Sequence, residues 1–278
     1  MSDYFFPNQS PQTLQLEGRF RHEAAKLPEE SRLVLYDVLS QSGPSFAPTQ
    51  FILEPAMTLA CQRGGEIAFP RPLPLVKLSH ILFGYEEWLQ RKYCLPGFVE
   101  VEPGDVVIDC GAYVGGFSLS AARIAGELHA FEPEPRNFAC VARNLAGYSN
   151  VRANNSGLYN ETKIASLNIS ASSVEHSLLR PDDGAPVAVT EIQVVALADY
   201  CRMQGIDRLD FVKIEAEGVE LEVFAGLGAM QPKKFAIDVS PERDGQSPAE
   251  EFRIRLEARG YEVRQRGHVM FARREAMR

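Results

Sequence analysis

A glycine-rich segment and a later acidic residue are the first residues in the sequence whose types and spacing suit a chemical task. Residues 109–116 read Asp-Cys-Gly-Ala-Tyr-Val-Gly-Gly, and Glu132 stands just before Pro133. A glycine turn lets the backbone approach a ligand closely, and the start of a following helix favours a polar or anionic group. An acidic side chain can accept hydrogen bonds from both hydroxyls of a ribose. Together the two segments predict a nucleoside-binding site, although Asp109 alone could be a helix cap and Glu132 a solvated strand end.

The spacing of the glycines bears on which nucleoside cofactor would bind. A dinucleotide fingerprint reads Gly-x-Gly-x-x-Gly, and its second glycine clears space for a pyrophosphate. Tyr113 occupies that second position and would crowd the pyrophosphate. The pattern argues against a nicotinamide-dependent oxidoreductase, which stays open as an alternative, as does a catalytically silent cofactor-binding protein.

Three polar residues further along are candidates for catalysis at an acceptor, that is, at a molecule that receives a transferred group. Glu215 follows an apolar run and shares a strand face with Lys213, while His176 lies in the polar segment 170–177. Glu215 would orient an acceptor or remove its proton, or else hold the loop that follows it. We interpret Lys213 as the partner of a carboxylate and Glu217 as a cap of the next helix. His176 is either a base that works near neutral pH or a solvated loop residue.

The elements that would position these residues alternate between strands and helices after residue 95. Apolar runs predict strands at 106–108, 128–131, from 151, 211–214 and 235–239. Helices are predicted at 117–124, at 135–145, and between a capping box of Ser247 with Glu250 and a stop at Gly260, and residues 261–263 and 268–271 form a hairpin. Such alternation predicts a mostly parallel sheet with helices on both faces, and ligands of these sheets bind outside the carboxyl ends of the strands.

The first 95 residues have a different, irregular and proline-rich pattern. Helices are expected at 28–43 and 75–93, with short strands at 51–53 and 66–69. We therefore divide the chain into an N-terminal extension of residues 1–95, expected to cover the acceptor pocket, and a catalytic domain of residues 96–278.

The composition is that of an ordinary globular protein and limits the classes of partner. The 278 residues include 29 basic and 37 acidic side chains, which gives a net charge of −8 and a pI of about 5.3. This acidic balance lacks the signature of a nucleic-acid binder, and no apolar segment reaches the roughly 18 residues of a membrane span. Without a secretory signal or a Cys-x-x-Cys pair, we expect a cytoplasmic protein with reduced thiols. No metal is predicted, because no His, Asp and Glu cluster has metal-ligand spacing.

Residues 103–115, 130–138 and 206–223 resemble, in this order, three segments of the FkbM family of class I S-adenosylmethionine-dependent methyltransferases. The third segment contains Lys-Ile-Glu-Ala-Glu-Gly, which is the most family-specific of the motifs. The likeness extends over about residues 95–272, and residues 197–200 resemble the short helix that precedes the fourth strand in the family.

The resemblance implies a Rossmann-like, doubly wound and mostly parallel seven-stranded sheet with a C-terminal antiparallel hairpin. It also implies transfer of a methyl group from S-adenosylmethionine to a hydroxyl of a sugar, glycolipid or natural product, with the protein mainly supplying positioning. The family usually has Asn where Tyr113 stands and Asp where Glu215 stands. A tyrosine would pack on the cofactor or narrow the pocket, and a glutamate reaches one methylene further.

The motifs and the resemblance define a set of expected site residues. The cofactor site is expected to comprise Asp109, Gly111, Ala112, Tyr113, Gly115, Glu132, Pro133 and Ser156. The catalytic candidates are Glu215, His176 and Lys213. The expected partner is a small-molecule or glycan hydroxyl acceptor, with no nucleic acid and no membrane span, and homo-oligomer formation is left open.

Overall fold

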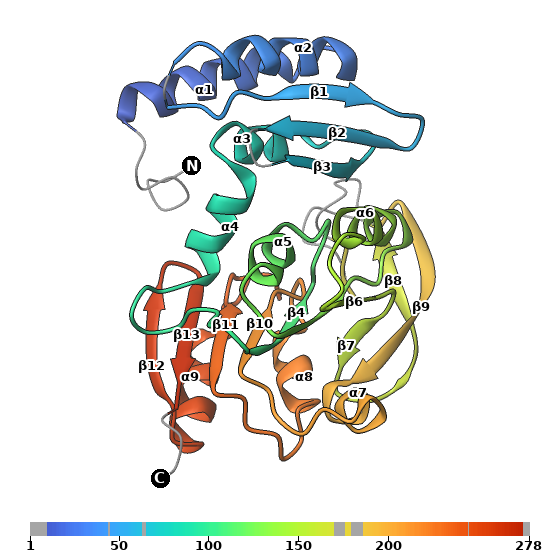
Figure 1. Cartoon of the computed structure of the whole chain (residues 1–278), viewed down its shortest axis with the longest axis vertical. Coiled ribbons are helices and arrows are strands. Elements are labelled where there is room, and N and C mark those ends of the chain that lie inside the picture. The colour runs from blue at the N-terminus through green and yellow to red at the C-terminus, as the bar shows by residue number, and fades with distance from the viewer. Residues whose placement is uncertain are drawn as a thin grey trace. The chain divides into compact units, whose positions relative to one another are not determined.

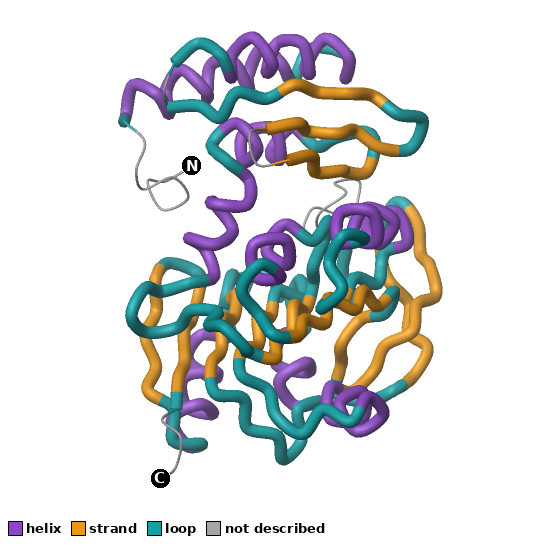
Figure 2. Tube along the Cα trace, viewed as in Figure 1, coloured by secondary structure: helices purple, strands orange, loops and turns teal. Residues whose placement is uncertain are grey.

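The computed structural model describes residues 10–43, 45–62, 65–169, 176–178, 186–243 and 245–274. The chain divides into two compact units, which comprise Met1–Lys92 and Tyr93–Arg278. Figure 1 labels their helices and strands, and Figure 2 colours the same trace by secondary structure.

The first unit combines helices with a small antiparallel sheet. Its helices are α1 (Pro11–Ala24), α2 (Glu29–Ser40), α3 (Leu75–Leu82) and α4 (Tyr85–Tyr93), whose last residue already belongs to the second unit. Its strands are β1 (Gln50–Leu53), β2 (Met57–Gln62) and β3 (Gly65–Pro70), which pair in the order β1-β2-β3. Helix α1 and strand β2 were not predicted from the sequence.

The single helix predicted over residues 75–93 is wrong, because the structure divides it into α3 and α4. Phe83 is the C-cap of α3, and Gly84 follows with a φ of 84°. A residue in this left-handed conformation ends a helix, and glycine adopts it without steric cost. The apolar spacing continues across the break, so the periodicity alone gave no sign of it.

The second unit is built on a seven-stranded sheet. Its strands are β4 (Val106–Cys110), β5 (Glu127–Phe131), β6 (Val151–Asn154), β10 (Phe211–Ile214), β11 (Lys234–Asp238), β12 (Glu262–Arg266) and β13 (Val269–Arg273). They pair in the order β12-β13-β11-β10-β4-β5-β6. Strands β4, β5, β6, β10 and β11 are parallel, whereas β13 runs antiparallel to both β11 and β12. This arrangement confirms the predicted mostly parallel sheet with a C-terminal hairpin.

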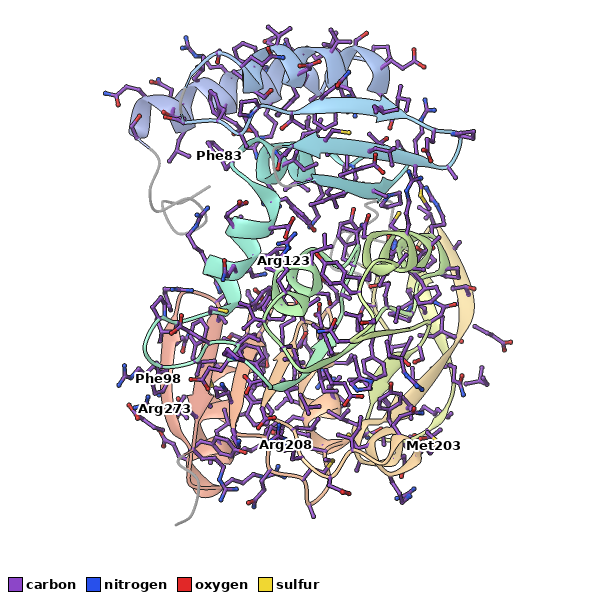
Figure 3. The ribbon with its side chains drawn as sticks, viewed as in Figure 1. Phe83, Phe98, Arg123, Met203, Arg208 and Arg273 are labelled. Atoms are coloured by element: carbon purple, nitrogen blue, oxygen red, sulfur yellow. The ribbon has the colours of Figure 1, made fainter. Side chains whose placement is uncertain are left out.

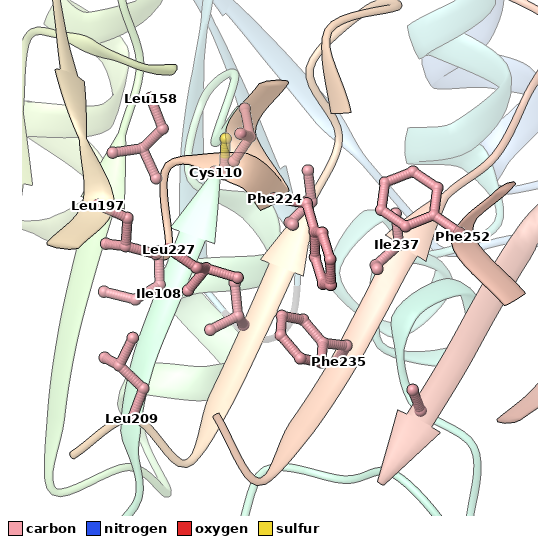
Figure 4. Packing of buried hydrophobic residues seen from close by; sticks show 14 of the residues in the cluster. Ile108, Cys110, Leu158, Leu197, Leu209, Phe224, Leu227, Phe235, Ile237 and Phe252 are labelled. Carbon is pink, nitrogen blue, oxygen red and sulfur yellow. The ribbon is translucent and has the colours of Figure 1, made fainter. Parts of the chain in front are cut away.

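Helices cover both faces of this sheet, as neighbouring residues of β10 show. The helices of this unit are α5 (Gly116–Ala122), α6 (Pro135–Leu145), α7 (Leu197–Gln204), α8 (Glu220–Ala225) and α9 (Ala249–Ala258). Phe211 stacks on Phe117 of α5, with ring centroids 5.8 Å apart. The next residue, Val212, points to the other face and belongs to the buried cluster that contains Phe224 of α8 and Phe252 of α9 (Figure 4).

The start of α9 differs from the predicted capping box. Its N-cap is Pro248, which has no side chain for capping, and Glu250 lies in the first turn. The hydroxyl of Ser247 accepts a hydrogen bond from the N–H of Ala249 at 3.3 Å and donates to the carbonyl oxygen of Val239, which follows β11. Ser247 therefore bonds to the first turn of α9 as predicted and also ties it to the sheet, but among the described residues no bond from Glu250 to Ser247 completes the capping box.

A second, three-stranded sheet, which was not predicted from the sequence, lies between β6 and β10 in the chain and includes the strands on either side of the polar segment 170–177. It contains β7 (Gly157–Tyr159), β8 (Lys163–Ile169) and β9 (Ala188–Ala196), in the order β7-β9-β8. Its small core comprises Leu167, Ile192 and Val194, so these strands lack the continuous apolar runs of buried strands. Residues 170–175 of the polar segment lie outside the described residues.

Candidate functional site

The turn after β4 contacts the end of β10 through its backbone. Gly111 has a φ of 74°, and a Cβ atom on it would lie 1.8 Å from the carbonyl oxygen of Glu215. We expected Gly111 to leave room for a ligand, and the structure shows that its missing side chain leaves room for the β10 backbone. The amide groups of Gly111 and Ala112 both donate to the carbonyl oxygen of Phe131, which joins the turn to the end of β5.

Tyr113 adopts a backbone conformation that is uncommon for a bulky residue. Its φ is 55°, in the left-handed region, which is costly for residues with a large side chain. This conformation directs its N–H toward Glu132, whose Oε2 accepts it at 2.9 Å. Gly115 follows with a φ of 82° and is the N-cap of α5. The loop is therefore shaped around the carboxylate at the end of β5.

Glu132 is a buried carboxylate held by backbone amides. Its Oε2 accepts a hydrogen bond from the N–H of Tyr113, and its Oε1 accepts one from the N–H of Glu134, each at 2.9 Å. Burial raises the pKa of Glu132 to about 8, although these two hydrogen bonds act in the opposite direction. A side-chain hydrogen bond with Asn137 also lowers this pKa, and the carboxylate keeps the capacity to accept a further hydrogen bond from a ligand.

Two further expected cofactor residues, Pro133 and Ser156, lie at the same edge of the sheet. The side-chain amide of Asn155 donates to the carbonyl oxygens of Glu132 and Pro133, at 3.0 and 3.2 Å. Ser156 is half-buried and lies between the end of β6 and the start of β7. The fold thus places both residues beside Glu132, and their contact with a cofactor stays a prediction.

Asp109 makes its contacts within the protein. Its side chain is fully buried, and Oδ2 accepts a hydrogen bond from the hydroxyl of Ser118 at 2.7 Å. Oδ1 lies 3.0 Å from the ammonium of Lys213. These contacts join β4 to α5 and to β10, so the role of Asp109 that the structure makes visible is to hold the site together.

The ammonium of Lys213 connects the ends of β4 and β10. Nζ donates to the carbonyl oxygens of Cys110 and Gly111, at 3.2 and 2.7 Å, and forms ion pairs with Asp109 and Glu215. Burial favours the neutral amine, but the two carboxylates outweigh this effect and raise the pKa of Lys213. These ion pairs confirm the interpretation of Lys213 as a partner of carboxylates. Because it stays protonated, it positions its neighbours.

Glu215 lies at the end of β10 with its side chain partly open to solvent. Its side chain is 27% exposed, and Oε2 lies 3.2 Å from the ammonium of Lys213. Tyr93, which is fully buried, packs against Lys213, with Nζ 5.0 Å from the centre of its ring. Burial and then the carboxylate of Glu215 raise the pKa of Tyr93. Sequence reasoning missed Tyr93, because helical spacing is its only signal.

The loop after β10 is held by Glu220, which sequence reasoning did not single out. Oε1 of Glu220 accepts hydrogen bonds from the amides of Ala216 and Gly218, at 2.8 and 3.2 Å. The task that the sequence leaves open for Glu215 thus belongs to Glu220, and the sequence predicts Glu217 as a cap of the next helix. The N-cap of α8 is Val219 and makes no side-chain hydrogen bond, so the prediction for Glu217 is wrong.

Burial and neighbouring carboxylates make two glutamates near this edge of the sheet weaker acids than usual. Burial raises the pKa of Glu220 to about 7. Burial, followed by the charges of Glu217 and Glu220, raises the pKa of Glu242 to about 10. Both residues are close in space to the end of β10, and only the folded chain reveals that they gather there.

His176 lies near the loop after β10 because the neighbouring Ser177 bonds to that loop. The hydroxyl of Ser177 donates to the carbonyl oxygen of Glu217 at 2.5 Å, and its backbone pairs with Asn168 of β8. His176 itself is half-buried. The structure therefore places this candidate base near the loop after β10, although its role is untested.

Among the described residues, no group of three or more His, Cys, Asp and Glu side chains could hold a metal ion. Within the same residues, no helix is both long and apolar enough to cross a membrane.

The strand order and the glycine loop before α5 define a Rossmann-like protein of the class I methyltransferase type. Residues 109–263 match the model of the Methyltransferase FkbM domain. Because the match covers more than half of the chain, the protein belongs to the FkbM methyltransferase family.

Three curated relatives show the range of this similarity. The chain is 28% identical over 155 residues to methyltransferase sdnD of Sordaria araneosa, which covers 44% of this chain and 60% of that protein. It is 27% identical to 31-O-demethyl-FK506 methyltransferase FkbM of Streptomyces tacrolimicus and 26% identical to methyltransferase 1 of Beauveria bassiana. These two matches each cover 55% of this chain and 70% of the relative. The chain thus spans less than two thirds of sdnD.

A solved structure of methyltransferase FkbM from Methylobacillus flagellatus KT is also similar. It aligns with a TM-score of 0.44 at 18% identity and covers 72% of this chain and 53% of that chain.

Proposed function

We propose that this protein is an S-adenosylmethionine-dependent O-methyltransferase that acts on a hydroxyl of a small molecule or glycan. The observation that supports this most is the buried carboxylate of Glu132, at the end of β5 and beside the loop after β4. A relative named 31-O-demethyl-FK506 methyltransferase supports an oxygen atom of a natural product as the acceptor.

The residues at the edge of the sheet fit the proposed cofactor. Glu132 would accept hydrogen bonds from the ribose hydroxyls, since its carboxylate keeps acceptor capacity. Ala112, Tyr113, Pro133 and Ser156 would line the same site. When bound, S-adenosylmethionine supplies an electrophilic methyl group on a sulfonium.

The proposed task of Glu215 is to orient the acceptor hydroxyl or to take its proton. Its carboxylate is partly exposed and forms an ion pair with Lys213, which is itself held by an ion pair with Asp109. We propose Lys213 as a positioning residue, because its donor bonds and raised pKa keep it protonated. His176, close to the same loop, is the second candidate for the base.

The first unit is expected to take part in binding the acceptor. We propose that residues 1–95 contribute to acceptor recognition. Substitutions in this unit should then raise KM for the acceptor without changing the affinity for the cofactor. If KM does not respond to any of them, the proposal for the first unit is wrong.

The experiment that tests the proposed function is a methyl-transfer assay against a panel of hydroxylated compounds. With an acceptor found, Glu215→Gln should lower kcat by about 10²-fold, in the range of general acid–base groups, with unchanged affinity for S-adenosylmethionine. Glu127→Gln, at the opposite end of β5, is the control and should leave kcat unchanged. Near-normal turnover in Glu215→Gln would contradict its role, and His176→Ala would then be tested. Failure of all acceptors despite tight cofactor binding would instead indicate a silent binding protein.

A further inference from the structure

The first unit contains a cavity of its own. Its volume is about 610 Å³, within the range of about 300–1,000 Å³ typical of small-molecule sites. It is formed by the segment before β1, by strands β2 and β3, and by the start of α4. The described lining residues are Gly43, Ser45, Phe46, Ala47, Pro48, Ala60, Gln62, Gly65, Ile67, Phe83, Gly84, Glu86, Glu87 and Arg91.

One wall of the cavity is apolar and aromatic. The rings of Phe46 and Phe83 lie with centroids 5.6 Å apart and planes tilted by 43°, and Figure 3 labels Phe83. Ala60 and Ile67 add aliphatic surface from β2 and β3. The N–H of Ala47 donates to the carbonyl oxygen of Leu82 at 2.7 Å and anchors the segment that carries Phe46. The wall is therefore suited to an apolar ring.

Gln62 supplies a polar group whose orientation is fixed by its neighbours. Its Nε2 donates to Thr49 Oγ1 at 2.8 Å and to the carbonyl oxygen of Ile81 at 2.7 Å. Thr49 can only accept in this contact, because its own hydroxyl donates to the carbonyl oxygen of Ala47. Both amide hydrogens of Gln62 are thus used, and no described residue donates to its Oε1. Gln62 can offer a ligand only an acceptor.

The charged residues of the lining favour the same ligand chemistry. Glu86, Glu87 and Arg91 bring two carboxylates and one guanidinium, so the described lining residues together carry a net negative charge. Glu87 is exposed, its Oε2 lies 2.8 Å from where a Cβ of Gly84 would be, and it forms no ion pair with a described residue. An anionic ligand would be disfavoured, whereas a hydrogen-bond donor would find acceptors at Gln62 and Glu87.

We propose that this cavity binds a largely apolar, uncharged small molecule that carries an N–H or O–H donor. The ring of the molecule packs on Phe46 and Phe83, and its donor bonds to Oε1 of Gln62. This binding site belongs to the first unit alone and does not depend on the proposed methyl transfer.

The probe that tests this site is N-phenyl-1-naphthylamine, an uncharged fluorophore with one N–H donor. Its fluorescence should rise saturably with the full chain. Ala47→Phe, which fills the cavity, should weaken binding by about tenfold or more. Val38→Phe adds the same ring at an exposed position of α2, outside the lining, and should leave binding unchanged. A lack of saturable binding, or equal binding by both variants with unchanged thermal unfolding, would overturn the proposal.

A second comparison tests the donor without relying on a cavity-filling variant. The wild-type protein should bind N-phenyl-1-naphthylamine several-fold more tightly than 1-phenylnaphthalene, which has a similar shape but no N–H. Gln62→Met, which removes the acceptor, should abolish this preference and still bind both compounds. If the preference is absent in the wild type, or survives in Gln62→Met, the assignment of Gln62 is wrong.

Discussion

A Cβ atom on Gly111 would lie 1.8 Å from the carbonyl oxygen of Glu215, so the turn after β4 touches the end of β10 backbone to backbone. This one contact therefore fixes the position of the glycine loop after β4 relative to Glu215, the proposed base. Any side chain at Gly111 would push the two strand ends apart, and its φ of 74° adds backbone strain.

Gly111→Ala should consequently reduce stability and cofactor binding together. We expect a loss of about 2–4 kcal/mol in the free energy of unfolding, from overpacking and from strain at positive φ. Denaturant unfolding measures this loss. Gly147→Ala is the matched control, because a Cβ there would meet no atom within 4 Å, and its stability should stay near that of the wild type. A Gly111→Ala variant as stable as the wild type would contradict the close contact between Gly111 and Glu215.

Lys213→Met should be among the most destabilising substitutions in the second unit. It leaves the fully buried carboxylate of Asp109 without its cation, and such losses cost about 3–5 kcal/mol. Lys163→Met removes an exposed ion pair with Glu161 and should leave the free energy of unfolding nearly unchanged. Adding Asp109→Asn to Lys213→Met should recover part of the stability in urea unfolding. The absence of any recovery would show that charge burial is not the cause.

The sequence predicted the residues at the strand ends better than the contacts between them. The apolar run of residues 106–108, and a similar run before Glu132, predicted that both segments end at one edge of a parallel sheet. No local signal could show that Gly111 would face the carbonyl of Glu215, because these residues meet only when β4 pairs with β10. Tyr93 was missed for the same reason: its neighbour Lys213 is far away in the sequence.

The elements that were missed have weak local patterns. The helix predicted over residues 75–93 continues its apolar spacing across Gly84, so only the backbone conformation of that glycine reveals the break. Strand β7 has only three residues, β8 has a single buried residue, and the core of Leu167, Ile192 and Val194 is too small to give a continuous apolar run. Tertiary packing, which a local pattern does not contain, decides such elements.

Cofactor affinity should depend on pH through Glu132. Burial raises the pKa of Glu132 in the free protein to about 8, and ribose hydroxyls that donate to the carboxylate would lower it. Binding below pH 8 then releases a proton. As the pH rises from 6 to 8, the Kd for S-adenosylmethionine should therefore fall by up to about tenfold per pH unit, and it should level off above pH 8. Titrations at several pH values measure this. In Glu132→Gln the trend over this range should disappear.

The same carboxyl group should make the stability of the free protein fall as the pH rises, whereas the affinity for the cofactor should increase. Because its folded-state pKa lies above the unfolded value, its contribution is fully present below about pH 4.5 and is lost as the pH rises through about 8. Glu132→Gln should therefore become more stable relative to the wild type as the pH rises from 6 to 9, in denaturant unfolding without cofactor. A constant difference over this range would show that Glu132 does not titrate there.

The central claim is that S-adenosylmethionine binds at the end of β5 against Glu132, and calorimetric titration tests it most directly. The wild-type chain should bind S-adenosylmethionine and S-adenosylhomocysteine but not NAD. Glu132→Ala should weaken both by at least about tenfold, because it removes charge-assisted hydrogen bonds worth about 1.5–3 kcal/mol each. Glu127→Ala, at the start of the same strand, should bind like the wild type. Binding of NAD in place of the adenosyl ligands, or an unchanged Kd in a folded Glu132→Ala variant, would contradict the account.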